Sequence, residues 1–146
     1  MSKVSTNGQI QNLTDSEISY VTSFDWQGHV VGQYPSPILH KDTGTFQHVG
    51  NQNGGSEAAV VYLTKNKNDK SYHAIAAWLN ESSSPKSKAY ALIAEPKPFT
   101  NELWGEIHDK LHNSNTNSSS THDGLTLTVQ IGEGDSPTLL ATISYA

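Results

Sequence analysis

The chain has 146 residues, of which 34% are hydrophobic and 16% charged, both below the usual share for a globular protein. Nine Lys and Arg residues against 14 acidic ones give a net charge of −5, which argues against nucleic acid as a partner because binding to phosphate backbones needs a basic surface. The absence of cysteine excludes a disulfide scaffold, a thiolate metal site and a cysteine nucleophile.

The first half of the chain has the two-residue periodicity of β-strands. Side chains alternate between the two faces over residues 18–24, and a turn is predicted at 25–28 before a short strand at 29–31. Residues 38–40 and 45–49, separated by a Lys-Asp-Thr-Gly turn, are predicted to form a hairpin.

The same pattern continues to the end of the chain with one interruption. Further strands are predicted at 58–63, 72–79, 89–94, 125–131 and 138–145. About eight to ten short strands at this spacing are typical of a sandwich or barrel. We therefore expect a mainly β protein, in which residues 1–146 form a single domain built as an antiparallel β-sandwich.

The interruption is an α-helix predicted at about residues 100–112. Leu103, Ile107 and Leu111 recur every four residues and form an apolar stripe that should pack on a sheet. The Ser/Asn-rich segment 113–122 that follows has the composition of a flexible loop.

The most unusual local cluster is Asp-Trp-Gln-Gly-His at residues 25–29. A tryptophan beside polar side chains can stack on a ligand ring while its neighbours donate and accept hydrogen bonds. The alternative is that Trp26 only fills one end of the sandwich. The predicted ligand-binding residues are Asp25, Trp26, Gln27, His29, His48, Asn51 and Asn53.

Signatures of catalysis and of metal binding are weak. The chain has no Gly-x-Ser-x-Gly nucleophile elbow and no phosphate-binding Gly-rich loop, so we assign no catalytic residues, although His29 or His48 would suit a general base at neutral pH. His108 and His112 lie one helical turn apart, as metal ligands often do, but the residues between them offer no His-Glu-x-x-His carboxylate. We therefore predict no metal and no cofactor.

Three segments resemble the plant jasmonate-induced protein family of the 23 kDa class. They are FDWQGH at 24–29, FQHVG at 46–50 and AAVVY at 58–62, and the resemblance covers about residues 10 to 95. It implies a stress-responsive plant protein with no assigned enzymatic activity, so no catalytic residues are carried over. A more distant resemblance is to the actinoporin-like β-sandwich of pore formers and fungal lectins, which is architectural and does not fix function.

Together these observations favour a non-catalytic stress or defence protein with lectin-like recognition of a carbohydrate or glycoconjugate by the end loops of the sandwich. The alternatives are binding of a lipid headgroup or membrane surface through the actinoporin-like fold, or a small enzyme. No segment approaches the ~20 apolar residues of a transmembrane helix, and residues 1–8 lack a signal-peptide core, so a cytoplasmic location is expected. Edge strands leave a homodimer open.

Overall fold

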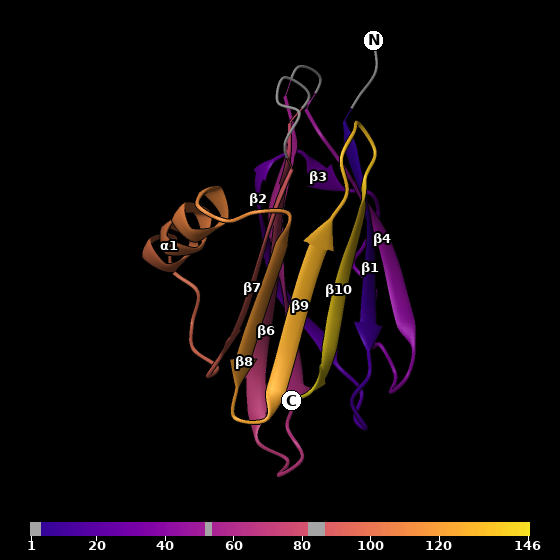
Figure 1. The fold of residues 1–146 in the computed structure, drawn as a ribbon, viewed down its shortest axis with the longest axis vertical. Coiled ribbons are helices and arrows are strands. Elements are labelled where there is room, and N and C mark those ends of the chain that lie inside the picture. The colour runs from indigo at the N-terminus through magenta and orange to yellow at the C-terminus, as the bar shows by residue number, and fades with distance from the viewer. Residues whose placement is uncertain (1–3, 52–53, 82–86) are drawn as a thin grey trace.

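Two β-sheets packed face to face make up the protein, which we describe from a computed structural model covering residues 4–51, 54–81 and 87–146 (Figure 1). The six-stranded sheet has the order β3 (His29–Val30), β4 (Thr43–Val49), β1 (Ser5–Asn12), β10 (Thr138–Tyr145), β9 (Leu125–Ile131), β8 (Asn117–His122). The four-stranded sheet has the order β2 (Ser19–Gln27), β5 (Ser56–Lys65), β6 (Ser71–Asn80), β7 (Lys88–Ala94). The predicted β-sandwich is thus confirmed.

The core between the sheets forms because strands of both sheets turn alternate apolar side chains inward. Leu125, Leu127 and Val129 of β9 are buried in one cluster with Val60 of β5 and Trp78 of β6. Alternation is clean in β9 because its other face is open to water. β5 is instead buried on both faces, which explains the continuous apolar run at its centre.

Helix α1 (Asn101–His112) covers the outer face of the four-stranded sheet, as predicted (Figure 1). The Thr100 hydroxyl caps its first turn by accepting a hydrogen bond from the Leu103 N–H at 3.1 Å. Trp104, Ile107 and Leu111 are buried against the sheet in a second apolar cluster. Within the described residues, no helix is long enough and apolar enough to cross a bilayer.

Two strands were not predicted. β1 pairs antiparallel with β4 but parallel with β10, the one exception to the expected antiparallel pairing among the described strands. Its inward positions include Thr6, Gly8 and Asn12, so burial alternates without an apolar pattern. Gly8 is required because a Cβ there would overlap the ring of Phe46.

The second missed strand is β8, which corrects the predicted loop at 113–122. Residues 117–122 pair antiparallel with β9. Of the serines that suggested a loop, Ser118 and Ser120 are two residues apart and on one face of the strand, and their hydroxyl oxygens accept hydrogen bonds from the backbone of β7. That residues 1–146 form a single domain stays a prediction.

Two local predictions in the first half of the chain are also wrong. Residues 38–40 do not form a hairpin with 45–49, since Ile38 bridges to Ile18 instead. The predicted turn at 25–28 is reduced to Gly28, because β2 continues through Gln27. Gly28 has a φ of 84°, and an added Cβ would overlap the backbone of β4, so the sharp reversal needs glycine.

Candidate functional site

The two long sides of the sandwich differ, and one of them is closed. There, β7 and β8, edge strands of opposite sheets, are joined by side-chain hydrogen bonds. The Ala91 N–H donates to Ser118 Oγ at 3.0 Å and the Ile93 N–H to Ser120 Oγ at 2.9 Å. These bonds satisfy donors of β7 that no further strand covers, so this side offers no exposed ladder for a ligand.

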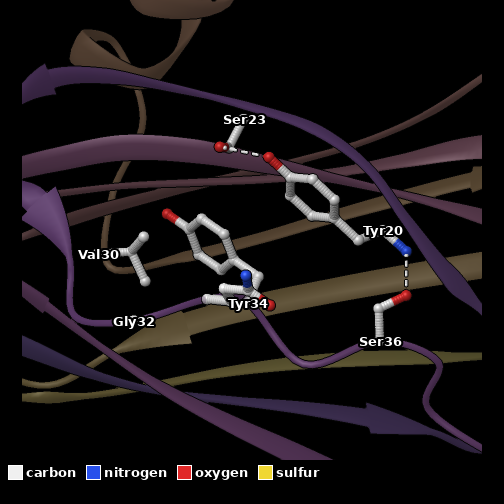
Figure 2. A pocket seen from close by; sticks show the side chains of 7 residues that line it. Tyr20, Ser23, Val30, Gly32, Tyr34 and Ser36 are labelled. Atoms are coloured by element: carbon white, nitrogen blue, oxygen red, sulfur yellow. Dashed lines mark hydrogen bonds between the residues drawn. The ribbon is translucent and has the colours of Figure 1, made fainter.

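The opposite side, between edge strands β2 and β3, contains a groove. The chain leaves β3 and crosses towards β2 over residues 31–38 without forming a strand of its own. This crossing segment is fixed at two points: the Tyr20 N–H donates to Ser36 Oγ at 2.9 Å, and the Tyr62 hydroxyl donates to the Pro35 carbonyl at 2.5 Å. The groove has a volume of about 440 Å³ and is lined by Tyr20, Ser23, Val30, Gly32, Gln33, Tyr34 and Ser36 (Figure 2).

Two tyrosines dominate the groove. The rings of Tyr20 and Tyr34 are stacked, with centroids 5.7 Å apart and planes 12° from parallel (Figure 2). Tyr20 is 39% exposed, whereas Tyr34 is 8% exposed and rests edge-on against Phe46 of the core. The groove therefore offers an aromatic wall with one accessible ring supported by a buried one.

The polar groups of the groove are hydroxyls and one amide. None of its seven lining residues is a lysine, arginine, histidine or carboxylate. Burial raises the pKa of Tyr34 far above its ordinary value, and the nearby Asp25 carboxylate adds to this effect, so Tyr34 stays a neutral hydroxyl. This buried hydroxyl has no hydrogen-bond partner within the described residues, a state that costs roughly 1–3 kcal/mol.

Exposed apolar side chains occur on the same segments of the chain that form the groove. The large hydrophobic residues with the greatest exposure in the described part of the chain are Tyr20, Val21, Val31 and Leu39. All four lie on β2 or the crossing segment and its continuation, and Val31 and Leu39 are each 51% exposed. We call Val21, Val31 and Leu39 the apolar rim: they do not line the groove but lie one to three residues along the chain from residues that do. Exposed apolar side chains beside a concave site are typical of a binding surface.

Of the predicted site residues, Asp25 and His48 belong to a polar network between the sheets, in which the Asp25 side chain is 40% exposed. His48 is fully buried, and its Nε2–H donates to Asp25 Oδ1 at 2.8 Å. In the neutral tautomer Nδ1 then accepts the Ser56 O–H at 2.7 Å. Ser56 Oγ in turn accepts from Trp78 Nε1 at 3.2 Å and from Thr6 Oγ1 at 2.9 Å.

This network resembles a Ser-His-Asp arrangement but has the properties of a structural link. Ser56 and His48 are both fully buried and both ring nitrogens of His48 are engaged, so no substrate reaches them. Burial lowers the pKa of His48 below its ordinary value of 6.5, against the opposing effect of Asp25. The geometry does not support His48 as a general base.

Trp26 and Gln27 lie beneath helix α1 and not at the end of the sandwich. The Trp26 ring stacks on His108 with centroids 4.7 Å apart. The Gln27 amide donates to Glu57 Oε1 at 3.0 Å and accepts from the Gly55 N–H at 3.0 Å. Both side chains are thus engaged by the protein itself.

The remaining predicted residues are His29, which lies close enough to His48 to lower the pKa of that imidazole, Asn51 and Asn53. His29 and Asn51 are exposed, and Asn53 lies outside the described residues. The six described members of the predicted site do not converge on one open surface, and their role in ligand binding stays a prediction. Sequence reasoning missed Tyr20 and Tyr34; the available signal was Tyr-Pro-Ser-Pro at 34–37, which cannot enter a central strand and so places a tyrosine beside an edge.

Comparisons with known proteins agree with this architecture. The model of the Nakanori-like protein family matches residues 2–146. A jasmonate-induced protein homolog from Atriplex canescens is 30% identical over 104 residues, 68% of this chain and 56% of that protein, so the chain spans about half the length of this relative. This match confirms the resemblance to jasmonate-induced proteins.

Solved structures show the same fold. The crystal structure of the lipid binding protein Nakanori has a TM-score of 0.87 at 17% identity and covers 99% of this chain and 72% of that one. The Xerocomus chrysenteron lectin XCL has a TM-score of 0.65 at 11% identity and covers 98% and 100% of the two chains. At these identities the likeness shows the fold alone, and it confirms the architectural resemblance to fungal lectins.

Proposed function

The chain belongs to the Nakanori-like protein family, and from this premise we propose that it is a non-catalytic binding protein that takes the zwitterionic headgroup of a membrane lipid into the groove beside β2. The observation that carries the proposal is the stacked Tyr20–Tyr34 pair, whose buried member has a hydroxyl without a partner. The other features of the groove narrow the kind of headgroup.

The charge of the site favours a cation over an anion. Tyrosine faces attract quaternary ammonium groups, a contact worth about 0.5–2 kcal/mol per ring depending on desolvation. No cationic side chain lines the groove, and the Asp25 carboxylate is close enough to Tyr34 to help raise its pKa. A phosphate without an attached ammonium would find no positive partner.

The hydroxyls suit the other half of a zwitterion. Tyr34, Ser23 and Ser36 are donors that phosphate or ester oxygens can accept from. Because the Tyr34 hydroxyl is covered, a headgroup reaches it only if a groove side chain moves aside, and the bond then formed removes the cost of the unpaired donor.

The apolar rim fits a lipid surface. Val31 and Leu39 can enter the acyl boundary while Tyr20 lies at headgroup level, where tyrosine is favoured. The net charge of −5 opposes binding to anionic membranes, so a zwitterionic surface is the better match. That the Nakanori of known structure is described as a lipid binding protein supports the same proposal.

Co-sedimentation with vesicles tests the proposal. We expect binding to phosphatidylcholine vesicles and little to phosphatidylglycerol vesicles. Tyr20→Ala should weaken phosphatidylcholine binding about tenfold through loss of the exposed ring. Absence of binding, equal binding to both vesicles, or full binding by the Tyr20→Ala variant would overturn it.

A second pair of variants separates binding from folding. Tyr34→Phe removes an unpaired hydroxyl, so the free energy of unfolding should hold or rise by about 1 kcal/mol while binding weakens. Tyr72→Phe is the matched control: Tyr72 is also buried, but its hydroxyl donates to Asp123. It should lower stability and leave binding unchanged.

Carbohydrate recognition is the second candidate, since an aromatic face beside hydroxyls and the Gln33 amide also suits a sugar ring. A glycan array or glycolipid vesicles would show it as binding that soluble phosphocholine does not compete. A role in stress or defence, a cytoplasmic location and a homodimer belong to the same proposal; the jasmonate-induced relative supports the first.

A further inference from the structure

Two histidines of helix α1 converge on one carboxylate of the sheet beneath it. Nε2 of His108 and Nε2 of His112 each lie 2.7 Å from Oε2 of Glu57 in β5. The three candidate ligand atoms all lie within 4.8 Å of one another. Asp109 lies between the two histidines in the helix but is not part of this cluster. The carboxylate of the cluster comes from the sheet, from a position more than 50 residues away in the chain.

The environment of Glu57 favours a cation. Glu57 is 3% exposed, and within the described residues its ion-pair partners are the two imidazoles, with no lysine in reach. The chain contains no arginine at all. Lys88, which reaches the end of the helix, donates to the His112 carbonyl and not to the carboxylate.

The surroundings hold the ligands in place. The Gln27 amide donates to Glu57 Oε1 and leaves Oε2 directed at the histidines. The Trp26 ring stacks on His108 at 4.7 Å and 28°. Such outer contacts are what orient ligating side chains in metal sites.

We propose that Glu57, His108 and His112 form a binding site for Zn²⁺, with Gln27 as a positioning residue. Two imidazoles and a carboxylate match the nitrogen and oxygen donors that Zn²⁺ takes, whereas Ca²⁺ and Mg²⁺ require oxygen ligands. Zn–ligand bonds of about 2.1 Å in a tetrahedron place donor atoms about 3.4 Å apart. Each imidazole must therefore withdraw by about 0.7 Å, which their side-chain exposures of 35% and 45% permit.

The bound ion would take the place of the proton shared between His112 Nε2 and Glu57 and would lie between His108 Nε2 and the same carboxylate oxygen. Each imidazole then binds through Nε2 and carries its proton on Nδ1, and a water completes the four ligands. The ion would also join the C-terminal half of α1 to β5. Zn²⁺ should therefore raise the thermal stability of the protein in a concentration-dependent way.

Isothermal titration calorimetry of the chelator-treated full chain with ZnCl₂ tests the site. We expect one ion per chain, and Co²⁺ in its place should show the visible absorption of tetrahedral nitrogen and oxygen coordination. His108→Ala and His112→Ala should each weaken binding more than about 100-fold, beyond the roughly 10–100-fold expected for Gln27→Leu as a residue that only positions a ligand.

His40→Ala provides the matched control, because His40 is exposed and distant in sequence from the cluster. It should leave Zn²⁺ affinity and the Co²⁺ spectrum unchanged. Because the His112 side chain is 45% exposed, its variant should still fold, although loss of the contact with buried Glu57 should lower its stability; a cooperative unfolding transition without metal checks this. No Zn²⁺ binding by the folded wild-type chain, or equal affinity of the His112→Ala variant, would overturn the proposal; neither result depends on the lipid groove.

Discussion

The two long sides of the sandwich differ in how the edge strands of the two sheets are held together. On the β7/β8 side, serine hydroxyls from one sheet bond the edge backbone of the other. On the β2/β3 side, the crossing segment lies over the opening and leaves a groove with an apolar rim. Recognition is thus possible on the side where the sheets are not joined at their edges.

The groove side is joined from within instead. His48 of β4 reaches Asp25 of β2 and Ser56 of β5, so one buried side chain connects both sheets. The Tyr62 hydroxyl fixes the crossing segment from below. The open edge of this sandwich is therefore held by a polar anchor beneath it, and each side can be loosened separately.

Loss of the internal anchor should have the largest effect. His48→Ala removes a fully buried ring and leaves Asp25 and Ser56 without their partner, so the free energy of unfolding should fall by about 3 kcal/mol. Urea unfolding followed by tryptophan fluorescence measures it. A loss below about 1 kcal/mol would show that the groove side does not depend on this link.

Acidification should loosen the same side without a mutation. Because burial holds the pKa of folded His48 below 6.5, the unfolded chain binds the proton first as the pH falls, and stability decreases from about pH 6.5 downwards until the lowered pKa is reached. The slope is at most about 1.4 kcal/mol per pH unit. His73, whose pKa burial also lowers, adds in the same direction.

Unfolding measured between about pH 7.5 and 5.5 gives this slope, and His48→Gln should flatten it. Hydrogen exchange should show faster opening of β4 at low pH with little change in β8, where hydroxyls do not titrate. An identical slope in the variant would assign the effect to other groups.

Weakening the closed side should lower the free energy of unfolding less than loss of His48 does. Ser118→Ala and Ser120→Ala each leave one backbone N–H of β7 without its partner, so each should lower the free energy of unfolding by about 1 kcal/mol. Ser119→Ala, exposed on the other face of β8, should have no measurable effect. Equal losses at Ser119 and Ser118 would mean that the edge bonds contribute nothing specific.

Most of the fold was predictable because the strands concerned carry apolar residues inward. β9 and α1 have clear periodicities of two and of about four residues, and both were found. β1 and β8 were missed because their inward positions are polar, and burial there is compensated by hydrogen bonds to partners far away in the chain. A pattern of hydrophobicity along the sequence does not show such distant hydrogen-bond partners.

The candidate site was less predictable for the same reason. His48 and Asp25 stand out in the sequence, but the contacts of His48 with Ser56 and Trp78 show that His48 is internal. His108 and His112 were noticed as a pair, but the carboxylate beside them belongs to β5. Contacts between side chains of different elements depend on tertiary packing, which the pattern of residues along one chain does not reveal.

Substitutions in the apolar rim should have the smallest effect on stability. They also allow a direct comparison of the two sides, because an exposed apolar side chain can be removed from one and added to the other. Val31→Ser and Leu39→Ser alter exposed side chains, so the free energy of unfolding should stay within about 0.5 kcal/mol. If the rim enters a lipid surface, each change should still weaken binding to phosphatidylcholine vesicles about fivefold, from roughly 1 kcal/mol of lost apolar transfer. Ser119→Val adds a matched valine to the closed side and should not strengthen binding. Unchanged binding by both rim variants would restrict recognition to the tyrosines, because a headgroup held in the groove alone does not require the rim to leave water.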